Sequence, residues 1–181
     1  WIRNECGMQE LADELTEKRT RAAEAFVQKV EEELAFLDMP KVRLSLFSRP
    51  KALSSNGCDD MEFLISPNPG ETPRPLSKIA SGGELSRMML AIKTLEAEKG
   101  GVGTMVFDEI DTGISGQTAW KVAEKMGRLA GDHQILCITH LPQIAAMEDS
   151  HFLIAKESSG GRTVTHISRL SETDSDGELA R

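Results

Sequence analysis

Two neighbouring carboxylates, Asp108 and Glu109, follow the apolar run at residues 105–107 in the segment MVFDEID. Such a run is typical of a short buried strand, and ligands of open α/β sheets bind beyond the carboxyl ends of the strands. Adjacent carboxylates repel each other there unless a cation or a shared proton relieves the repulsion. One carboxylate could hold Mg²⁺ while the other deprotonates a water molecule, or both could be solvated acids at a strand end.

A histidine occupies the equivalent place after a second apolar run. His140 follows QILCIT at residues 134–139. A lone histidine can serve either structure or proton transfer, and a position at the carboxyl end of a parallel strand favours function. The loop DTGISGQ at residues 111–117 comes directly after the two carboxylates. This loop is either a plain turn between a strand and a helix or a surface that faces a partner.

A third candidate is the glycine-rich stretch SKIASGGELSRMML at residues 77–90. Ser81, Gly82, Gly83 and Glu84 lie where an amphipathic helix pattern begins. Serine is a good helix cap, and glycines let the chain turn. The same groups could instead bind a phosphate, because the free N–H groups and the helix dipole attract anions. The stretch by itself leaves both interpretations open.

The elements around these residues alternate between strand and helix. Residues 104–107 and 134–139 read as buried strands, and the helix between them carries an apolar face of Ala119, Val122, Ala123, Met126 and Leu129. Strands and helices in this order predict parallel pairing through a right-handed crossover, so the fold class is α/β. The helix after the glycine stretch is expected to bury Leu85, Met88, Met89, Ile92 and Leu95 and to stop at Gly100.

The first part of the chain predicts a long helix followed by strands. Apolar residues recur at helical spacing over residues 9–37, and Pro40 ends the pattern. Ala23, Val30 and Leu37 are seven residues apart, which fits either a coiled-coil seam or a surface helix packed on its own domain. Alternating residues at 42–46 and 61–65 predict half-buried strands joined by a loop that contains Asn56.

The remaining segments are a connector, a hairpin and a tail. The proline-rich residues 66–75 are too broken for a helix or strand. Residues 151–156 and 162–170 predict a closing hairpin, because a Ser-Ser-Gly-Gly turn separates them. The polar residues 171–181 predict a mobile tail.

Composition limits the class of function. The 181 residues carry a net charge of −8, which argues against strong nucleic-acid binding by this chain itself. No apolar run is long enough to cross a membrane, and the first residues do not resemble a signal peptide. The three cysteines are widely spaced and form no metal or disulfide pattern, which indicates a reducing, cytoplasmic setting.

Taken in order, these motifs resemble the C-terminal half of an ABC-type ATPase head. LSKIASGGELSRMMLAIK, FDEIDTGISGQTA and ITHLPQIAA are most similar to the RecN family, the SMC-like bacterial proteins of DNA double-strand break repair. The similarity is strongest over residues 76–150. The predicted helical arm resembles the returning strand of an SMC-type coiled coil, and GELAR resembles the beginning of the family's C-terminal end.

The resemblance implies a role for each motif. Ser81, Gly82, Gly83 and Glu84 would form the signature motif, which contacts the γ-phosphate of ATP held by the opposite subunit. On this basis the glycine stretch would be an anion site for a phosphate delivered by a second head.

The carboxylates and the histidine also acquire roles from the resemblance. Asp108 would be the Walker B carboxylate that serves Mg²⁺, Glu109 the general base, and His140 the switch histidine that touches the γ-phosphate. Ser115 would lie in the D-loop, next to the nucleotide at the dimer interface. Many ABC proteins have Asp where this chain has Ser115, so the resemblance assigns that loop no catalytic part.

One motif of the family is missing from the sequence. The 181 residues contain no G-x-x-x-x-G-K-[ST] motif, the loop that cradles phosphates in P-loop NTPases. We therefore expect the chain to be the C-terminal half of a P-loop NTPase head of the ABC/SMC type, with a partly parallel sheet flanked by helices. Residues 1–39 would be the end of the coiled coil and residues 40–181 the head lobe.

The resemblance implies an ATPase that acts in DNA repair and recombination. The N-terminal head lobe would carry the Walker A motif, a second head would bind in an ATP-dependent way, and DNA would be bound by the full-length protein. The chain alone is expected to be inactive, and the protein to be cytoplasmic and nucleoid-associated, with no membrane partner. The alternatives are a structural DNA clamp that uses ATP for head engagement and the nucleotide-binding domain of an ABC transporter. The coil-like arm and DEIDTGISG argue against the transporter.

Overall fold

A computed structural model describes residues 2–78, 82–97, 100, 102–159 and 162–180 of the chain. The chain forms two compact units, Trp1–Gly101 and Val102–Arg181. No helix within the described ranges combines the length and the apolar character that a membrane crossing needs.

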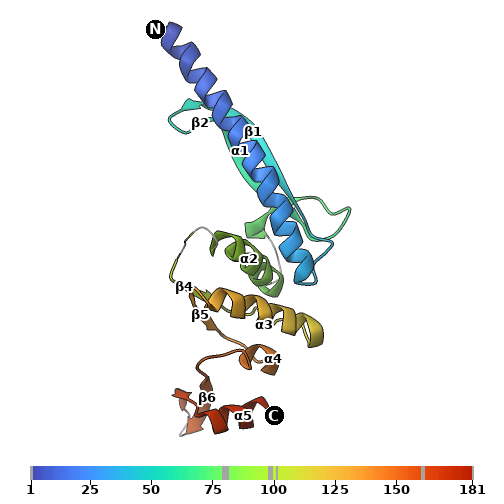
Figure 1. The fold of residues 1–181 in the computed structure, drawn as a ribbon, viewed down its shortest axis with the longest axis vertical. Coiled ribbons are helices and arrows are strands. Elements are labelled where there is room, and N and C mark those ends of the chain that lie inside the picture. Colours follow the sequence, from blue (N-terminus) through green and yellow to red (C-terminus); the bar gives the residue numbers. More distant parts are fainter. Residues whose placement is uncertain (1, 79–81, 98–99, 101, 160–161, 181) are drawn as a thin grey trace. The chain divides into compact units, whose positions relative to one another are not determined.

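The first unit contains a long helix beside a β-hairpin. Helix α1 spans Ile2–Phe36, and strands β1 (Arg43–Ser54) and β2 (Gly57–Ser66) run along it as an antiparallel pair (Figure 1). The hairpin closes with Ser54 opposite Gly57, whose φ of +88° is a conformation that favours glycine. The connector predicted to lack regular structure contains a short strand, β3 (Arg74–Pro75), because residues 74 and 75 pair with β2.

The core of the first unit lies between α1, the hairpin and the next helix. Leu34 and Ile65 have no exposed surface, and the rings of Phe26 and Phe63 lie 5.4 Å apart. The three heptad residues Ala23, Val30 and Leu37 are all buried in this unit. Over residues 23–37 the helix therefore packs on its own domain, whereas nearer the N-terminus Leu11 is 67% exposed.

Helix α2 (Gly82–Ala97) contacts α1 and follows a short 3₁₀ turn, η1 (Leu76–Lys78). Its fully buried side chains include Met88 and Leu90. The predicted face was partly wrong, because Leu85, Met89, Ile92 and Leu95 are only half-buried. Leu90 and Ala91 lie off that face and are buried, so neighbouring residues cover a wider arc of α2 than its amphipathic pattern indicates.

The second unit begins with the predicted crossover. Strands β4 (Thr104–Phe107) and β5 (Gln134–Cys137) pair in parallel, and α3 (Gly116–Ala130) connects them. All five apolar residues of the predicted α3 face are buried. Helix α4 (Pro142–Ala145) packs on α3.

The parallel pair is covered on one face only. Met105 and Phe107 are each 6% exposed, whereas Val106 is 65% exposed and Leu136, its partner in the register, is 49% exposed. The prediction that both strands are buried holds for one face and is wrong for the other.

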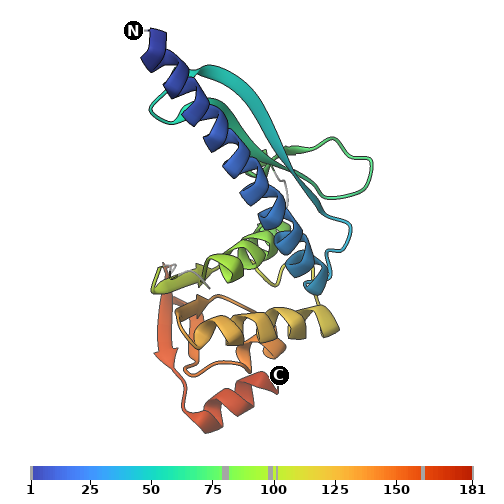
Figure 2. The ribbon, with the colours of Figure 1, turned by 45° about the horizontal axis from the view of Figure 1, so that its top comes forward.

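The chain ends in a hairpin and a helix (Figure 2). Strands β6 (Phe152–Ser159) and β7 (Arg162–Arg169) pair antiparallel, as predicted. The predicted mobile tail is wrong, because Glu172–Leu179 form helix α5. The Ser171 hydroxyl caps α5 by accepting from the Asp174 N–H at 3.2 Å, and the buried Ser175 hydroxyl donates to Glu148 at 2.7 Å.

The fold is mixed α/β, as the sequence predicted. The strands of the described residues form a three-stranded antiparallel sheet, a two-stranded parallel sheet and a two-stranded antiparallel sheet, instead of one partly parallel sheet. The division into an arm at residues 1–39 and a head lobe at residues 40–181 concerns roles in a larger molecule and stays a prediction.

Candidate functional site

The carboxyl edge of the β4–β5 sheet collects three of the predicted site residues. Phe107 is in register with Cys137, and the Ile138 N–H donates to the Phe107 carbonyl at 3.0 Å, which extends the ladder by one bond. Asp108 and Glu109 leave β4, and His140 leaves β5, at this same edge. The structure therefore places the three residues after neighbouring strand ends, although His140 lies far from Asp108 in the sequence.

The Asp108–Glu109 pair has an unusual backbone. Both residues are exposed, and the Glu109 N–H donates to Asp108 Oδ1 at 2.9 Å. Glu109 has a φ of +56°, a left-handed conformation that residues other than glycine seldom adopt. Such strain is concentrated at functional sites, where the surrounding structure maintains it. The chain turns sharply here, because the Thr112 N–H donates to the Glu109 carbonyl at 3.1 Å.

A third carboxylate, Asp111, lies beneath the edge and is only 3% exposed. Its Oδ2 accepts from the Thr139 hydroxyl at 2.5 Å and from the His140 N–H at 2.8 Å, and the His140 ring Nδ1 lies 3.1 Å away. Burial by itself would raise the pKa of Asp111, but these hydrogen bonds and the nearby imidazole outweigh burial and lower the pKa below its ordinary value. Asp111 is therefore a buried, charged anchor.

In the sequence, Asp111 is marked only as the beginning of the glycine-rich loop. The sequence feature that could have indicated a role for Asp111 is its position as the third acid in DEID, directly after the apolar Ile110. Spacing alone could not separate it from its exposed neighbours, because its burial depends on Thr139 and His140 from another strand end.

The field at this edge is negative. Burial raises the pKa of the Cys137 thiol to about 12, and the charges of Asp111 and Asp108 contribute to this increase. The part of this increase that comes from Asp111 and Asp108 has the sign that would attract a cation, whereas burial itself disfavours any charge.

The edge fits a magnesium ion that has few protein ligands. Among the described residues, no group of three or more His, Cys, Asp or Glu side chains is arranged to hold a metal. Mg²⁺ does not need such a cage, because it usually binds through one or two carboxylates together with phosphate oxygens and water. Asp108, which is exposed at the end of β4, fits this pattern as a single ligand.

The glycine-rich loop leads from the carboxylates into α3. Ser115 is exposed and occupies the N-cap position of α3, with φ −160° and ψ 173°, but its side chain makes no capping hydrogen bond. Gly113 and Gly116 have φ values of +75° and +55°. The Ile114 N–H donates to the Asp111 carbonyl at 3.3 Å, which ties the loop to the buried carboxylate.

The predicted signature stretch lies in the first unit, at the beginning of α2. Gly82 is exposed, Gly83 is buried and Glu84 is half-buried. Glu84 lies in the first turn of α2, where its negative charge interacts favourably with the positive end of the helix dipole. Ser81 lies outside the described residues, so its two interpretations stay open. Burial lowers the pKa of Arg87 one turn later, and the charge of Glu84 acts in the opposite direction.

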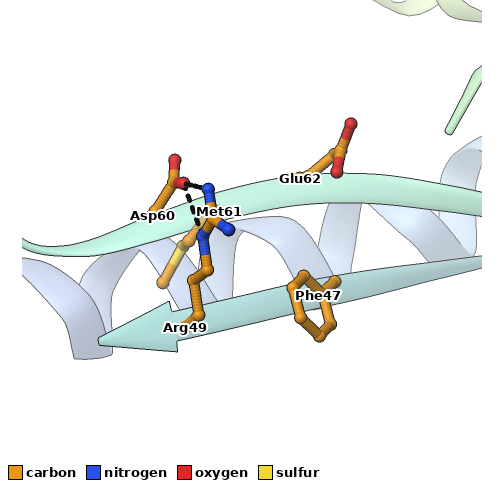
Figure 3. A pocket seen from close by; sticks show the side chains of 5 residues that line it. All are labelled: Phe47, Arg49, Asp60, Met61 and Glu62. Atoms are coloured by element: carbon orange, nitrogen blue, oxygen red, sulfur yellow. Dashed lines mark hydrogen bonds and ion pairs between the residues drawn. The ribbon is translucent and has the colours of Figure 1, made fainter. Parts of the chain in front are cut away.

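A shallow hollow on the hairpin is a separate feature (Figure 3). Phe47, Arg49, Asp60, Met61 and Glu62 line it. Arg49 Nε and Nη2 both donate to Asp60 Oδ2, at 2.8 Å and 2.6 Å, and this contact lowers the pKa of Asp60. Because the two charges at its centre already pair with each other, the hollow offers no candidate site.

Comparison with known sequences identifies similar proteins over most of the chain. No protein-family model matches it. The DNA repair protein RecN of Halalkalibacterium halodurans is 42% identical over 172 residues, which are 92% of this chain and 30% of that protein. RecN of Bacillus subtilis is 50% identical over 133 residues, 74% of this chain and 23% of that protein. The chain thus spans about a third or less of these relatives, and the resemblance to RecN is confirmed over that part.

Comparison with solved structures shows the same fold. The Smc head domain with a coiled coil and joint from Pyrococcus yayanosii has a TM-score of 0.61 at 22% identity, covering 89% of this chain and 29% of that one. A chain solved in work on ATP-driven dimerization and DNA-stimulated activation of SMC ATPases has a TM-score of 0.53 at 21% identity. That match covers 91% of this chain and 94% of that one. The fold is therefore SMC head-like, with a long helix at its N-terminal end.

Proposed function

We propose that this chain is the C-terminal half of an SMC-like ATPase head that acts in DNA double-strand break repair and recombination. The observation that carries the proposal is the carboxyl edge of β4–β5, where β4 runs into Asp108 and Glu109 and β5 leads to His140, in a chain similar to RecN. The edge supplies an acid for a cation, an acid for a water molecule and an imidazole for a phosphate, which are among the groups that ATP hydrolysis requires.

Each residue of the edge takes one role in the proposal. Glu109 is the general base for the attacking water, and its left-handed backbone turns it away from the line of β4. Asp108 holds Mg²⁺, which neutralises phosphate charge when it is bound. His140, whose side chain is 73% exposed, contacts the γ-phosphate.

The signature stretch belongs to a different active site in this proposal. Ser81, Gly82, Gly83 and Glu84 contact ATP that a second head holds, and Ser115 lies near that nucleotide at the interface between the heads. The helix that begins at Gly82 supports this assignment, because free N–H groups in the first turn of a helix favour a phosphate.

The partner for ATP binding is a second lobe that carries a Walker A motif. The exposed apolar face of β4–β5 supports this part of the proposal, because parallel sheets are normally covered on both faces. Val106, Leu136 and Ile138 are 65%, 49% and 50% exposed. We assign this face to the missing lobe, and we assign DNA binding and a cytoplasmic, nucleoid-associated location to the intact protein.

The test is Glu109→Gln in the intact protein. Losing a general base should reduce turnover by about 10²- to 10⁴-fold while ATP binding persists. The matched control is Glu124→Gln, which changes an exposed glutamate on α3 that pairs with Arg128. Turnover at the wild-type rate in Glu109→Gln would show that the base is wrongly assigned.

The same variant separates an ATPase from a structural clamp. In both cases Glu109→Gln should trap engaged heads, because ATP binds but is not hydrolysed. Repair of double-strand breaks in cells should be lost only if turnover itself is needed.

A further inference from the structure

Asp111 differs from the two acids that precede it. Asp108 and Glu109 are exposed, whereas Asp111 is 3% exposed. A buried carboxylate is costly unless hydrogen bonds or an opposite charge compensate it. The partners of Asp111 therefore indicate why the fold keeps a charge at this point.

Within the described part of the chain, the partners that the Asp111 side chain finds on another element are Thr139 and His140, in the segment that carries the proposed switch histidine. One oxygen, Oδ2, faces the Thr139 hydroxyl, the His140 N–H and the His140 ring Nδ1. The Thr139 hydroxyl also accepts from the Leu141 N–H at 3.1 Å, which fixes the backbone on the far side of His140. One carboxylate oxygen thus accepts a hydrogen bond from the main chain of His140 and also lies beside its ring.

This contact favours one placement of the ring hydrogen. At 3.1 Å an ionised carboxylate oxygen repels the lone pair of an unprotonated Nδ1, so hydrogen on Nδ1 of His140 is favoured. The lowered pKa of Asp111 keeps the carboxylate ionised at neutral pH. The tautomer with hydrogen on Nε2 alone is therefore disfavoured, and Nε2 is left for contacts outside the pair.

We propose that Asp111 is a positioning residue for His140, which holds the main chain at His140 and orients its ring, with hydrogen on Nδ1 as the spectroscopic signature of that contact. The inference rests on the proposed function, because it requires His140 to act on a phosphate. Asp111 itself touches no reacting atom and works through His140.

The first experiment needs no nucleotide. Long-range ¹H–¹⁵N spectra of the chain distinguish histidine tautomers, and the expected result at neutral pH is hydrogen on Nδ1 of His140. In Asp111→Ala the ring should shift toward the Nε2–H tautomer. A wild-type ring with hydrogen on Nε2 alone, or a ring unchanged in the variant, would overturn the inference.

The second experiment measures turnover in the intact protein. Misorienting a catalytic group typically costs about 10- to 100-fold, so Asp111→Ala should reduce kcat by that factor and change the KM for ATP less than about twofold. Asp111→Asn keeps the shape and one acceptor oxygen, and it should retain more activity. The control is Asp132→Asn, which alters an exposed carboxylate at the other end of β5.

The two hypotheses fail in different ways. If His140→Ala leaves turnover unchanged, the proposed role of His140 is wrong, whatever the tautomer. If His140→Ala abolishes turnover while Asp111→Ala retains wild-type kcat, only the role of Asp111 is wrong. Far-UV circular dichroism of each variant shows whether a loss of activity comes from unfolding.

Discussion

The two units bury their sheets differently. In the first unit, α1 covers one face of the β1–β2 hairpin, where Leu44 and Ile65 are buried, and the opposite face carries charged residues such as Arg49 and Glu62. In the second unit, α3 lies against one side of β4–β5, and the other side presents Val106 and Leu136. Antiparallel sheets commonly leave one polar face in water, whereas parallel sheets are normally buried on both faces.

The first unit covers the apolar face of its own hairpin, whereas the β4–β5 pair of the second unit leaves one apolar face for another segment to cover. The hairpin and α1 bury each other's apolar residues, and the buried charge between them, Asp59, is paired with Arg19 of α1. The parallel pair gains stability from α3 on one side, while burial of its other face would gain about 25 cal/mol for each Å² of apolar surface covered. The face that lacks a cover lies in the unit that carries the three residues proposed for hydrolysis.

The largest expected effect contrasts the two faces of β4. Phe107→Ala removes a side chain that is 6% exposed and should lower the free energy of unfolding by about 3–5 kcal/mol. Val106→Ala changes the adjacent residue, which is 65% exposed, and should cost less than about 1 kcal/mol. Urea unfolding followed by the fluorescence of Trp120, which lies on α3, measures both. Equal losses of unfolding free energy in the two variants would show that the two faces of β4 are equally buried, which would contradict the prediction.

The next effect tests the first unit at an ion pair between α1 and the hairpin. Arg19 pairs with Asp59, which is only 4% exposed, and Arg19 Nη1 also donates to the Asn56 carbonyl at 2.9 Å. Arg19→Met leaves Asp59 without its cation and should cost about 1–3 kcal/mol, a value reduced by the partial exposure of Arg19.

The double variant Arg19→Met/Asp59→Leu is the control for this ion pair. Because it removes both charges, it should recover most of the stability that the single variant loses. Thermal unfolding of the four proteins in the cycle measures the coupling, and a coupling near zero would show that the pair contributes nothing.

A smaller effect concerns the packing of α3 on α4. A Cβ added at Gly127 would lie 3.0 Å from Cε of Met147, the flexible end of a side chain that can move. Alanine has a higher helix propensity than glycine, so Gly127→Ala should change stability by between 0 and about +1 kcal/mol. Gly57→Ala is the contrasting variant in the first unit, because Gly57 has a φ of +88° and close neighbours in Leu15 and Arg19. It should destabilise the fold, and a loss in Gly127→Ala as large as that in Gly57→Ala would contradict the prediction.

The smallest effect appears only in acid. The pKa of Asp111 is lower in the folded chain than its ordinary value of 3.8, so the unfolded chain binds this proton more readily. Its contribution to stability is present above the ordinary pKa and is lost as the pH falls through the folded pKa. In Asp111→Asn, the free energy of unfolding should therefore decrease less steeply as the pH falls through the acidic range. Asp60→Asn is the comparison in the first unit, where the pKa is also lowered but the pair is exposed, and its effect should be weaker.

Much of this fold follows from local patterns. Apolar spacing predicted α1, α3, both hairpins and the parallel crossover, because each element buries a face that the sequence marks with alternating or helical periodicity. The tail was missed for the opposite reason. Helix α5 has little apolar pattern, and it is held by the Ser171 cap and by the contacts of Ser175 with Glu148 and His151, which are distant in sequence.

The candidate site was predictable in its types of residue but not in its geometry. A resemblance of motifs identified Asp108, Glu109 and His140, since their order along the chain is informative. The role of Asp111 was not predictable, because it depends on a hydrogen-bond pattern between two strand ends. Exposure of Val106 was also missed, because an apolar run predicts burial without specifying whether the covering residues lie in the same segment.

The long first helix has a mechanical consequence. Its 35 residues make a rod about 52 Å long, at 1.5 Å per residue. The β1–β2 turn meets the rod near its midpoint, through Gly57 beside Leu15 and Asn56 beside Arg19, and acts as a fulcrum. About 25 Å of helix extends from that fulcrum to Ile2, so a tilt of roughly 2° moves the tip by about 1 Å. Because the two arms are of similar length, a small tilt of the packed half is transmitted along the helix as a displacement of similar size at the other end.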